Sequence, residues 1–392
     1  MTVYRANDGP FRSERGRTSE GRFSDERGLP VNDRLTALRR LLVARGLDAA
    51  LVSGAADVRY LSGFRGDDAL LLVSADDALI CADSRFWVQI GGEVEGFELV
   101  RSEGGAGLFG DALSAWAASA GRAESDRRLG FQGDTVPYSG YRRLRRRFGG
   151  GLVDLGARVS ALREVKDGGE LQAMRAAAAI ADAALEAVVA RGLRGRSEIE
   201  VAWALEQAVR EGGAEAIAFP TIVAAGAHGA LPHAVPGDTP IAGGDLVVVD
   251  MGARLDGYHS DITRTFAVAR AAAAEREVYG IVLAAQQAGL EAVRDGVTAR
   301  AVDAAARAEI EAAGYGEAFG HGTGHGVGLE IHEMPRVART SRERLAAGTV
   351  VTVEPGIYLE GRFGVRIEDT VAVTRDGCER FTLSSKELRV VD

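Results

Sequence analysis

The chain has 392 residues, of which 46% are hydrophobic and 26% charged, so a buried core and two domains are expected. Its formal net charge of -9 disfavours nucleic acid and anionic membranes as partners, because both would repel it. No apolar run approaches the roughly 18 residues that a transmembrane helix needs. The two cysteines, Cys81 and Cys378, do not indicate a disulfide framework, and the start of the chain lacks a secretory signal, so we expect a cytoplasmic protein.

Residues 1–30 are dominated by Arg, Ser, Glu, Asp and Gly. They bury too little apolar surface to offset the entropy of ordering, so we predict a flexible tail. Beyond the tail, a leucine-rich helical pattern is followed by short apolar runs at 49–52, 69–73 and 78–81. Helices alternating with strands predict a small α/β domain over residues 31–160. We interpret its arginine-rich run at 142–147 as a solvated helix face, because no aromatic residues are interleaved.

A second domain is expected over residues 161–392, beginning with a long Ala-rich helix over 170–189. The next helix runs from Ser197, which forms a capping box with Glu200, to about residue 211. A later helix is predicted over 298–313. These two helices align at an offset of 101 residues, with Gly195 on Gly296, Ser197 on Thr298, Val201 on Val302 and Gly213 on Gly314. The alignment favours two halves of similar design, although helix pairs also resemble each other by chance.

All six histidines lie between His228 and His332, so metal or acid–base chemistry is expected in the second domain alone. In that region an apolar strand leads to Asp250, and Asp256-Gly257 is a strong signal for a type I′ hairpin turn. A two-residue turn makes Asp250 and Asp261 diagonal neighbours on one face, with Cα atoms about 7–8 Å apart. Two buried carboxylates repel each other unless a cation lies between them. The alternatives are a bulge that shifts the register and an exposed hairpin whose acids are placed by chance.

The second half offers a matching pair of acids. Glu354 ends an apolar strand, and Glu368 lies within a strand-like segment over 364–373, on the same face as Arg366. A Gly-rich segment between the two acid pairs carries His321, His325 and His332. This segment follows a helix and no Gly-Lys-Ser/Thr follows it, which disfavours a phosphate-binding loop.

Four carboxylates and one imidazole suit a pair of divalent ions such as Mn, Co or Zn. Two ions about 3.5–4 Å apart can share a hydroxide and stabilise both sides of a hydrolytic displacement. Thiolate ligands are absent from the set, which disfavours a structural zinc site.

These motifs resemble the pita-bread metallopeptidases, the group of aminopeptidase P, prolidase and methionine aminopeptidase. The resemblance rests on Asp250, Asp261-Ile-Thr-Arg-Thr, His325 in His-Gly-Thr-Gly-His, Glu354-Pro-Gly and Arg366-Ile-Glu368. It extends over about residues 33–392, because the front domain is similar to the creatinase-type N-terminal domain at Tyr60-Leu-Ser-Gly-Phe64 and Asp83-Ser-Arg85, and Arg163-Glu-Val-Lys166-Asp with Glu170 resembles the domain junction. The implied fold is α+β, a pita-bread catalytic domain with pseudo-twofold halves behind a smaller α/β N-terminal domain.

The resemblance also implies roles for individual residues. Asp250 would bind one metal ion, His325 and Glu354 the other, and Asp261 and Glu368 would bridge both. Glu354 would also take the proton of an attacking, metal-bridging hydroxide and pass it to the leaving nitrogen.

The remaining implied roles concern the substrate. His233 and His332 would stabilise the developing oxyanion, and His321 would line the proline side of the pocket. Arg366 would contact the product end or orient the bridging carboxylates. His228 and His259 match no implied role and are expected at the surface. Gly324 stands where the aminopeptidase P branch often has serine, which would alter local contacts but not metal binding.

The expected function is a manganese-dependent Xaa-Pro aminopeptidase, whose substrates are peptides with proline at the second position. The alternative is an Xaa-Pro dipeptidase (prolidase), which needs a cationic group to read the free carboxylate of proline, and the sequence does not show which arginine would do so. A metal-dependent lyase or non-peptidase hydrolase also fits the scaffold, as does a metal-free binding module, which the five complete ligand positions disfavour. The resemblance further implies a homodimer or higher homo-oligomer, with the front domain as the contact.

Overall fold

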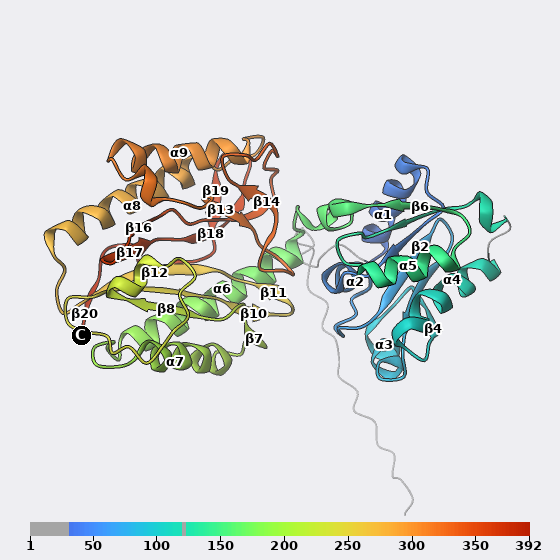
Figure 1. The fold of residues 1–392 in the computed structure, drawn as a ribbon, viewed down its shortest axis with the longest axis horizontal. Coiled ribbons are helices and arrows are strands. Elements are labelled where there is room, and N and C mark those ends of the chain that lie inside the picture. The colour runs from blue at the N-terminus through green and yellow to red at the C-terminus, as the bar shows by residue number, and fades with distance from the viewer. Residues whose placement is uncertain (1–30, 120–122) are drawn as a thin grey trace, which may run out of the picture.

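The computed structural model describes residues 31–119 and 123–392, so the predicted tail lies outside the described residues. The elements form two groups, and the chain passes from one to the other just before helix α6 (Figure 1). Among the helices of these residues, none is long and apolar enough to cross a membrane.

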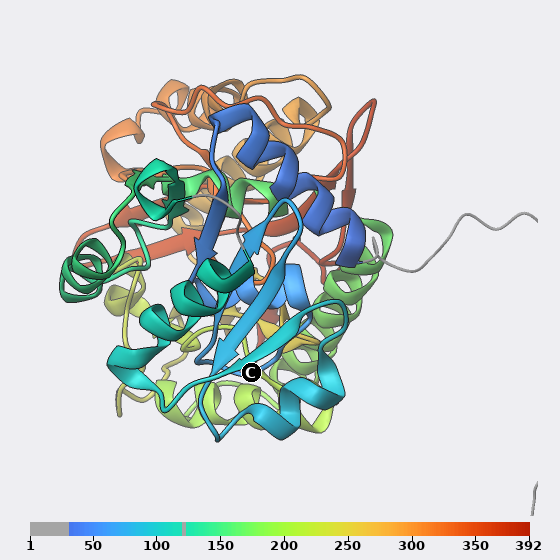
Figure 2. The ribbon, with the colours of Figure 1, turned by 90° about the vertical axis from the view of Figure 1, so that its right-hand side faces the viewer.

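The front group is built on a six-stranded sheet with the order β4-β3-β2-β1-β5-β6. Its strands are β1 (Ala49–Val52), β2 (Leu70–Ser74), β3 (Ala78–Ala82), β4 (Glu98–Arg101), β5 (Arg128–Phe131) and β6 (Gly151–Asp154). Its helices are α1 (Val31–Arg45), α2 (Ala55–Ser62), α3 (Trp87–Glu93), α4 (Leu108–Ser119) and α5 (Tyr138–Arg147). The three predicted strands are confirmed, and helices flank the sheet seen in Figure 2.

Both faces of the front sheet are buried, which explains its continuous apolar runs. Along β1, Ala50 and Val52 pack into a cluster with α1 and α2, while Leu51 packs into another with α4 and α5. On α5 the side chains of the arginine-rich run are largely exposed, as the sequence predicts.

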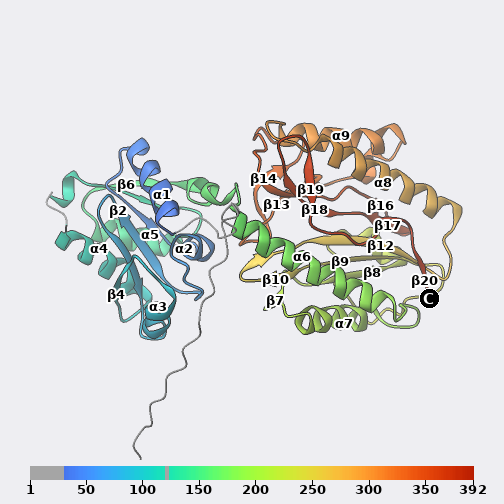
Figure 3. The ribbon, with the colours of Figure 1, turned by 180° about the vertical axis from the view of Figure 1, so that it is seen from behind.

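The second group carries the helices α6 (Gly168–Val189), α7 (Glu198–Glu211), α8 (Ala273–Ala292) and α9 (Ala299–Ala312). Its strands are β7 (Ala216–Ile217), β8 (Ile222–Ala225), β9 (Leu246–Met251), β10 (Ala253–Leu255), β11 (Tyr258–His259), β12 (Ile262–Val268), β13 (Gly324–Gly326), β14 (Glu333–Val337), β15 (Val350–Val353), β16 (Gly356–Leu359), β17 (Phe363–Arg366), β18 (Asp369–Val373), β19 (Cys378–Arg380) and β20 (Val390–Val391). They form four sheets, in the orders β20-β12-β9-β8, β14-β13-β15-β18-β19, β11-β10-β7 and β16-β17. Helices α6 and α7 lie outside the sheet that contains β9 and β12, and helices α8 and α9 lie outside the sheet that contains β15 and β18 (Figure 3).

The same connection into a helix is built twice in the second group. Gly195 donates its N–H to the carbonyl of Ile241 (2.9 Å), and Gly296 donates to Leu345 in the same way (2.8 Å). Ser197 then caps α7 and Thr298 caps α9, each by accepting a backbone N–H from the first turn of its helix. The predicted alignment of the two helices therefore reflects two halves that share more than their helices.

The hairpin that carries the two aspartates has the predicted register. Its turn residues Asp256 and Gly257 have positive φ angles of 48° and 78°, as a type I′ turn requires. Asp250 pairs with Thr263 across β9 and β12, without a bulge between them. The register therefore places Asp250 and Asp261 on one face.

The segment 364–373 differs from the prediction of one strand. Strand β17 ends at Arg366 and pairs with β16, whereas β18 begins at Asp369 and pairs with β15. The chain thus changes sheets at Ile367-Glu368. The predicted facing is nevertheless confirmed, because Arg366 and Glu368 line a cavity while Ile367 packs into the core.

Candidate active site

A cavity of about 620 Å³ lies between the two halves of the second group. Its walls include every residue that the sequence predicts for the site: Asp250, Asp261, His325, Glu354 and Glu368 as ligands, and His233, His321, His332 and Arg366 around them. The structure therefore brings the whole predicted set together.

Each half contributes one pair of acids, and each acid lies within or close to the end or the start of a strand. Asp250 lies in β9 and Asp261 directly precedes β12, so both come from the hairpin of the first half. Glu354 directly follows β15, and Glu368 lies between β17 and β18 in the second half. His325, on β13, is the imidazole between these pairs.

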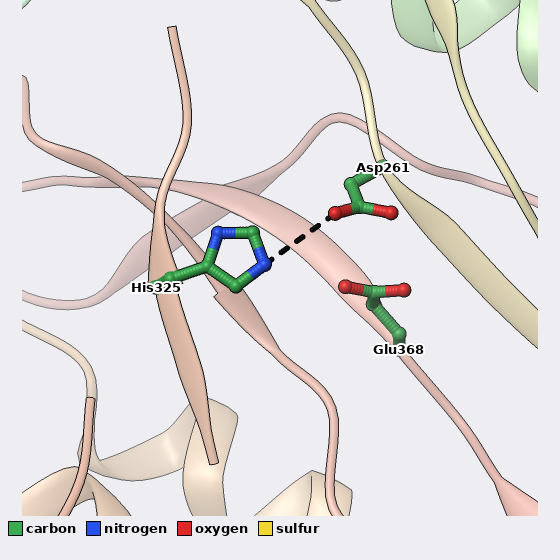
Figure 4. Close-up of side chains that lie close together, drawn as sticks. All are labelled: Asp261, His325 and Glu368. Carbon is green, nitrogen blue, oxygen red and sulfur yellow. Dashed lines mark ion pairs between the residues drawn. The ribbon is translucent and has the colours of Figure 1, made fainter. Parts of the chain in front are cut away.

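The side chains of Asp261, His325 and Glu368 point toward one another (Figure 4). One ligand atom of each lies within 4.8 Å of the other two, a spacing that could hold a metal ion. His325 Nε2 lies 3.5 Å from Asp261 Oδ2 and 3.4 Å from Glu354 Oε1.

The tautomer of His325 follows from its hydrogen bond. Its Nδ1 lies 3.0 Å from the carbonyl oxygen of Gly326, which can only accept, so Nδ1 carries the proton. Burial also lowers the pKa of His325 and favours the neutral ring. The lone pair of Nε2 therefore faces carboxylate oxygens, an arrangement that is repulsive until a cation binds between them.

The carboxylates of the site carry the same signature. Burial, and then the neighbouring acids, raise the pKa of Asp261 and of Glu368 well above their ordinary values, and burial raises that of Glu354. Asp250 Oδ1 is buried without a hydrogen-bond partner in the described residues. Four clustered carboxylates, one with an oxygen that has no hydrogen-bond partner, and a neutral imidazole are ligand types that bind divalent cations such as Mn, Co or Zn. The residues therefore fit metal binding.

Arg366 is the buried cation that organises these acids. Its Nη2 donates to Asp250 Oδ2 (2.6 Å), and its Nε donates to Thr263 Oγ1 (3.0 Å), which in turn donates to Glu368 Oε2 (2.8 Å). Its Nη1 donates to Tyr358 Oη (2.9 Å). Of the two roles expected for Arg366, this geometry favours orientation of the ligand carboxylates.

The three histidines around the predicted ligands lie at different parts of the cavity wall. The hydroxyl of Tyr358 donates to His321 Nε2 (2.9 Å), because His321 Nδ1 donates to the carbonyl of Gly322 (2.7 Å). The rings of His332 and His325 lie with centroids 4.4 Å apart, and burial lowers the pKa of His332. His233 lines the cavity from the loop that follows β8.

The expectation that His228 and His259 are surface residues is wrong for His259. His259 is buried, and its Nδ1 lies 3.1 Å from the carbonyl oxygen of Gly328. His228 Nδ1 lies 2.9 Å from the carboxylate of Glu198, and only 29% of the His228 side chain is exposed. Both partners are distant in the chain, so nothing in the local pattern indicates these structural roles.

Sequence reasoning missed three residues of the site. Thr263 is the cross-strand partner of Asp250, and Tyr358 lies on β16, so strand pairing could have indicated both. The third is Arg336 on β14, an exposed arginine that lines the cavity four positions after His332. Its guanidinium makes no hydrogen bond or ion pair with the residues that the structure describes, and no local signal distinguishes it from other arginines.

Comparisons with known proteins agree with this architecture. Residues 172–375 match the model of metallopeptidase family M24, and residues 34–165 match the creatinase/prolidase N-terminal domain. The Xaa-Pro dipeptidase of Pyrococcus furiosus is 46% identical over 230 residues, which are 59% of this chain and 66% of that protein.

Two solved structures are similar over nearly the whole chain. An Xaa-Pro dipeptidase from Bacillus anthracis is 39% identical with a TM-score of 0.88 and covers 92% of this chain and 100% of its own. An X-Pro aminopeptidase from Thermotoga maritima MSB8 is 37% identical with a TM-score of 0.82, again covering 92% and 100%. The predicted α+β pita-bread fold with a creatinase-like N-terminal domain is thus confirmed.

Proposed function

The chain belongs to metallopeptidase family M24, and from this premise we propose that it is an Xaa-Pro dipeptidase with two divalent metal ions in the cavity. The names of its relatives support the dipeptidase, the alternative in the sequence analysis, better than the aminopeptidase favoured there. Manganese as the metal, a homo-oligomer and a cytoplasmic location stay predictions. So do domains over 31–160 and 161–392, which the family matches to 34–165 and 172–375 support.

The single observation that carries the proposal is Arg336. A dipeptide ending in proline presents a free carboxylate close to the scissile bond, and a cation in the cavity wall is the group that reads it. Arg336 lines the cavity and is exposed, and its guanidinium has no protein partner among the described residues. A longer peptide would place an uncharged amide there instead.

Gly324 supports the same conclusion. A Cβ at this position would lie 2.0 Å from the carbonyl oxygen of Thr352, so β13 and β15 approach more closely than a side chain permits. The serine common in the aminopeptidase P branch would therefore require one of these strands to shift. The close approach of the two strands beside His325 therefore supports the dipeptidase over that branch.

The proposed chemistry is hydrolysis of the bond before proline. When bound, the divalent ions would polarise the scissile carbonyl and lower the pKa of a water molecule, which makes that water a better nucleophile once it loses a proton. Glu354 takes the proton of the attacking water and gives it to the proline nitrogen. His233 and His332 donate hydrogen bonds to the carbonyl oxygen as negative charge develops on it. His321, held by Tyr358, lines the proline side, and Arg366 keeps Asp250 in place.

An Xaa-Pro aminopeptidase is the second candidate, because the Thermotoga maritima structure of that name is nearly as similar as the dipeptidase. The two functions differ in one comparison. Metal-loaded enzyme is assayed with an Xaa-Pro dipeptide, the C-terminal amide of that dipeptide and an Xaa-Pro-Yaa tripeptide. We expect kcat/KM to be highest for the free dipeptide by at least tenfold. Equal or faster cleavage of the tripeptide would establish the aminopeptidase instead.

The role of Arg336 has its own test. Arg336→Met should raise KM for the free dipeptide about tenfold to hundredfold, since a charge-assisted hydrogen bond contributes roughly 1.5–3 kcal/mol. KM for the amide should change little. The control is Arg339→Met, which removes an exposed arginine that pairs with Glu311 outside the cavity. Equal effects of Arg336→Met on acid and amide would argue against carboxylate recognition.

A further inference from the structure

We propose that Arg163 is a positioning residue, through which the front group fixes the segment 328–336 that carries His332 and Arg336 into the cavity. The inference rests on the proposed function for its substrate readout, but the contacts that carry it do not depend on that function. Arg163 lies in the connection between the two groups, and only 3% of its side chain is exposed.

The guanidinium of Arg163 joins three carboxylates from two groups. Its Nε donates to Asp57 Oδ1 on α2 of the front group (2.7 Å). Its two terminal nitrogens donate to Glu330 and Glu333, one on either side of His332. Lys166 adds a second cation to Glu333, with Nζ 3.0 Å from Oε2. The planar five-donor group of arginine can hold three acids in fixed directions, which the compact ammonium of lysine cannot.

The segment 328–336 is tied down on its own side as well. The N–H of Glu330 donates to the carboxylate of Glu333 (3.1 Å), which closes a turn around His332. Leu329 packs into the hydrophobic cluster of the front group rather than into that of its own half. Arg336 follows on β14, which begins at Glu333. The position of Glu333 therefore determines the backbone positions of its neighbours His332 and Arg336, whose side chains line the cavity.

The other end of the network is anchored by further hydrogen bonds in the front group. Asp57 accepts a hydrogen bond from Gln132 Nε2 (2.5 Å), and Gln132 Oε1 accepts from the N–H groups of Ser53 (2.8 Å) and Gly54 (3.0 Å). Ser53 and Gln132 directly follow the paired central strands β1 and β5 of the front sheet. A continuous chain of hydrogen bonds thus runs from the middle of that sheet to the turn around His332.

A buried ionic network of this kind adds little net stability compared with apolar residues, because its charges lose their hydration. The network does define the orientation of the three carboxylates, because each of them accepts a hydrogen bond from Arg163. Loss of Arg163 geometry should therefore affect substrate binding at Arg336 more than the metal ligands, which are held by Arg366 and its partners.

The test uses full-length metal-loaded enzyme with Arg163→Lys, Asp57→Asn and the control Arg34→Lys. Arg34 also bridges the two groups, with Nη2 2.8 Å from Asp167 Oδ2, but does not reach the segment 328–336. We expect Arg163→Lys and Asp57→Asn to raise KM for the free dipeptide about tenfold through Arg336, and to lower kcat as well through His332, which lies on the same segment. The preference for the free dipeptide over its amide should shrink in these two variants and stay unchanged in Arg34→Lys.

Hydrogen–deuterium exchange of 328–336 is measured on the same proteins and needs no substrate. Faster exchange is expected in Arg163→Lys and Asp57→Asn and not in the control. Unchanged exchange and an unchanged acid-to-amide preference in Arg163→Lys would overturn the inference. If wild-type enzyme itself does not prefer the free acid, the dipeptidase proposal fails, while the exchange result still decides the role of Arg163.

Discussion

The two halves of the second group solve the same problem with different side chains. In each half, a buried acid on a helix holds the loop that carries a cavity histidine. Glu198 on α7 accepts hydrogen bonds from the N–H groups of Ala225 (2.8 Å) and Gly237 (3.1 Å), which are the two ends of the loop with His233. The first half thus anchors its loop by direct contact with one carboxylate.

The second half works through an intermediary. Asp303 on α9 accepts from the N–H of Thr323 (3.1 Å) and pairs with Arg307 (2.8 Å). Arg307 then donates to the carbonyl oxygens of Phe319 (3.0 Å) and His321 (2.7 Å). At the helix offset of 101, Glu198 aligns with Ala299 and Asp303 with Ala202. The fold was therefore repeated while its loop anchors were not, which shows that architecture constrains where an anchor is needed but not which residue provides it.

The largest effect should come from removing the divalent ions that the two halves are proposed to bind together. Chelation should abolish activity and reverse the pH dependence of stability. In metal-free protein the raised pKa values of Asp261, Glu354 and Glu368 mean that the folded state binds more protons than the unfolded state. Their contribution to stability is then greatest below about pH 4 and is lost as pH rises through the folded pKa values.

With metal bound, the same carboxylates must be deprotonated, so stability should fall as pH is lowered. Melting temperatures between pH 4 and pH 8, with and without chelator, measure both slopes. Parallel curves for the two forms would argue that the carboxylates do not share a cation.

The second test concerns Glu354, the acid of the second half that is proposed to transfer the proton. Glu354→Gln should lower kcat by about 10²–10⁴, the range for loss of a general base, because an amide cannot take the proton of the attacking water. Glu360→Gln, an exposed acid six positions further on, is the control. Steady-state kinetics and metal content are measured on both variants. Retention of a tenth of the wild-type kcat by metal-loaded Glu354→Gln would contradict the proton-transfer role.

The third test sharpens the comparison of the loop anchors. Asp303→Asn should lower the free energy of unfolding by about 3–5 kcal/mol, because Arg307 is left as a buried charge without its partner. Glu198→Gln should cost only about 1–3 kcal/mol, since it leaves backbone N–H groups without an acceptor but no uncompensated arginine. Urea denaturation measures both. Equal losses would mean that the intermediary arginine makes no difference.

The smallest effects are expected at the helix starts. Ser197→Ala and Thr298→Ala each remove a side-chain acceptor from the first turn of α7 or α9, at a cost of about 1 kcal/mol. Because neither residue contacts the cavity, kcat/KM should stay within twofold of wild type. A larger loss of activity in either variant would show that helix position is coupled to the site.

Local patterns predicted much of this molecule, since they report interactions between residues that are close in sequence. The Asp256-Gly257 turn and its alternating strands were enough to place Asp250 beside Asp261. Contacts between distant residues were not accessible in this way. His259 contacts the carbonyl oxygen of Gly328, which is distant in the chain. The change of sheets at Ile367 depends on the pairing of β17 with β16 and of β18 with β15. Arg336 became a candidate only when the cavity showed which arginine has a free guanidinium among the described residues.

The packing of Leu329 into the front cluster has a practical consequence for protein engineering. Exchanging the front group between homologues would replace the residues that pack against Leu329 but not Leu329 itself. It would likewise replace Asp57 but not its ion-pair partner Arg163. A chimera that matches only the proposed metal ligands would keep those residues in place but displace the segment 328–336. Compatible swaps should therefore be chosen by the residues at this seam before overall similarity is considered.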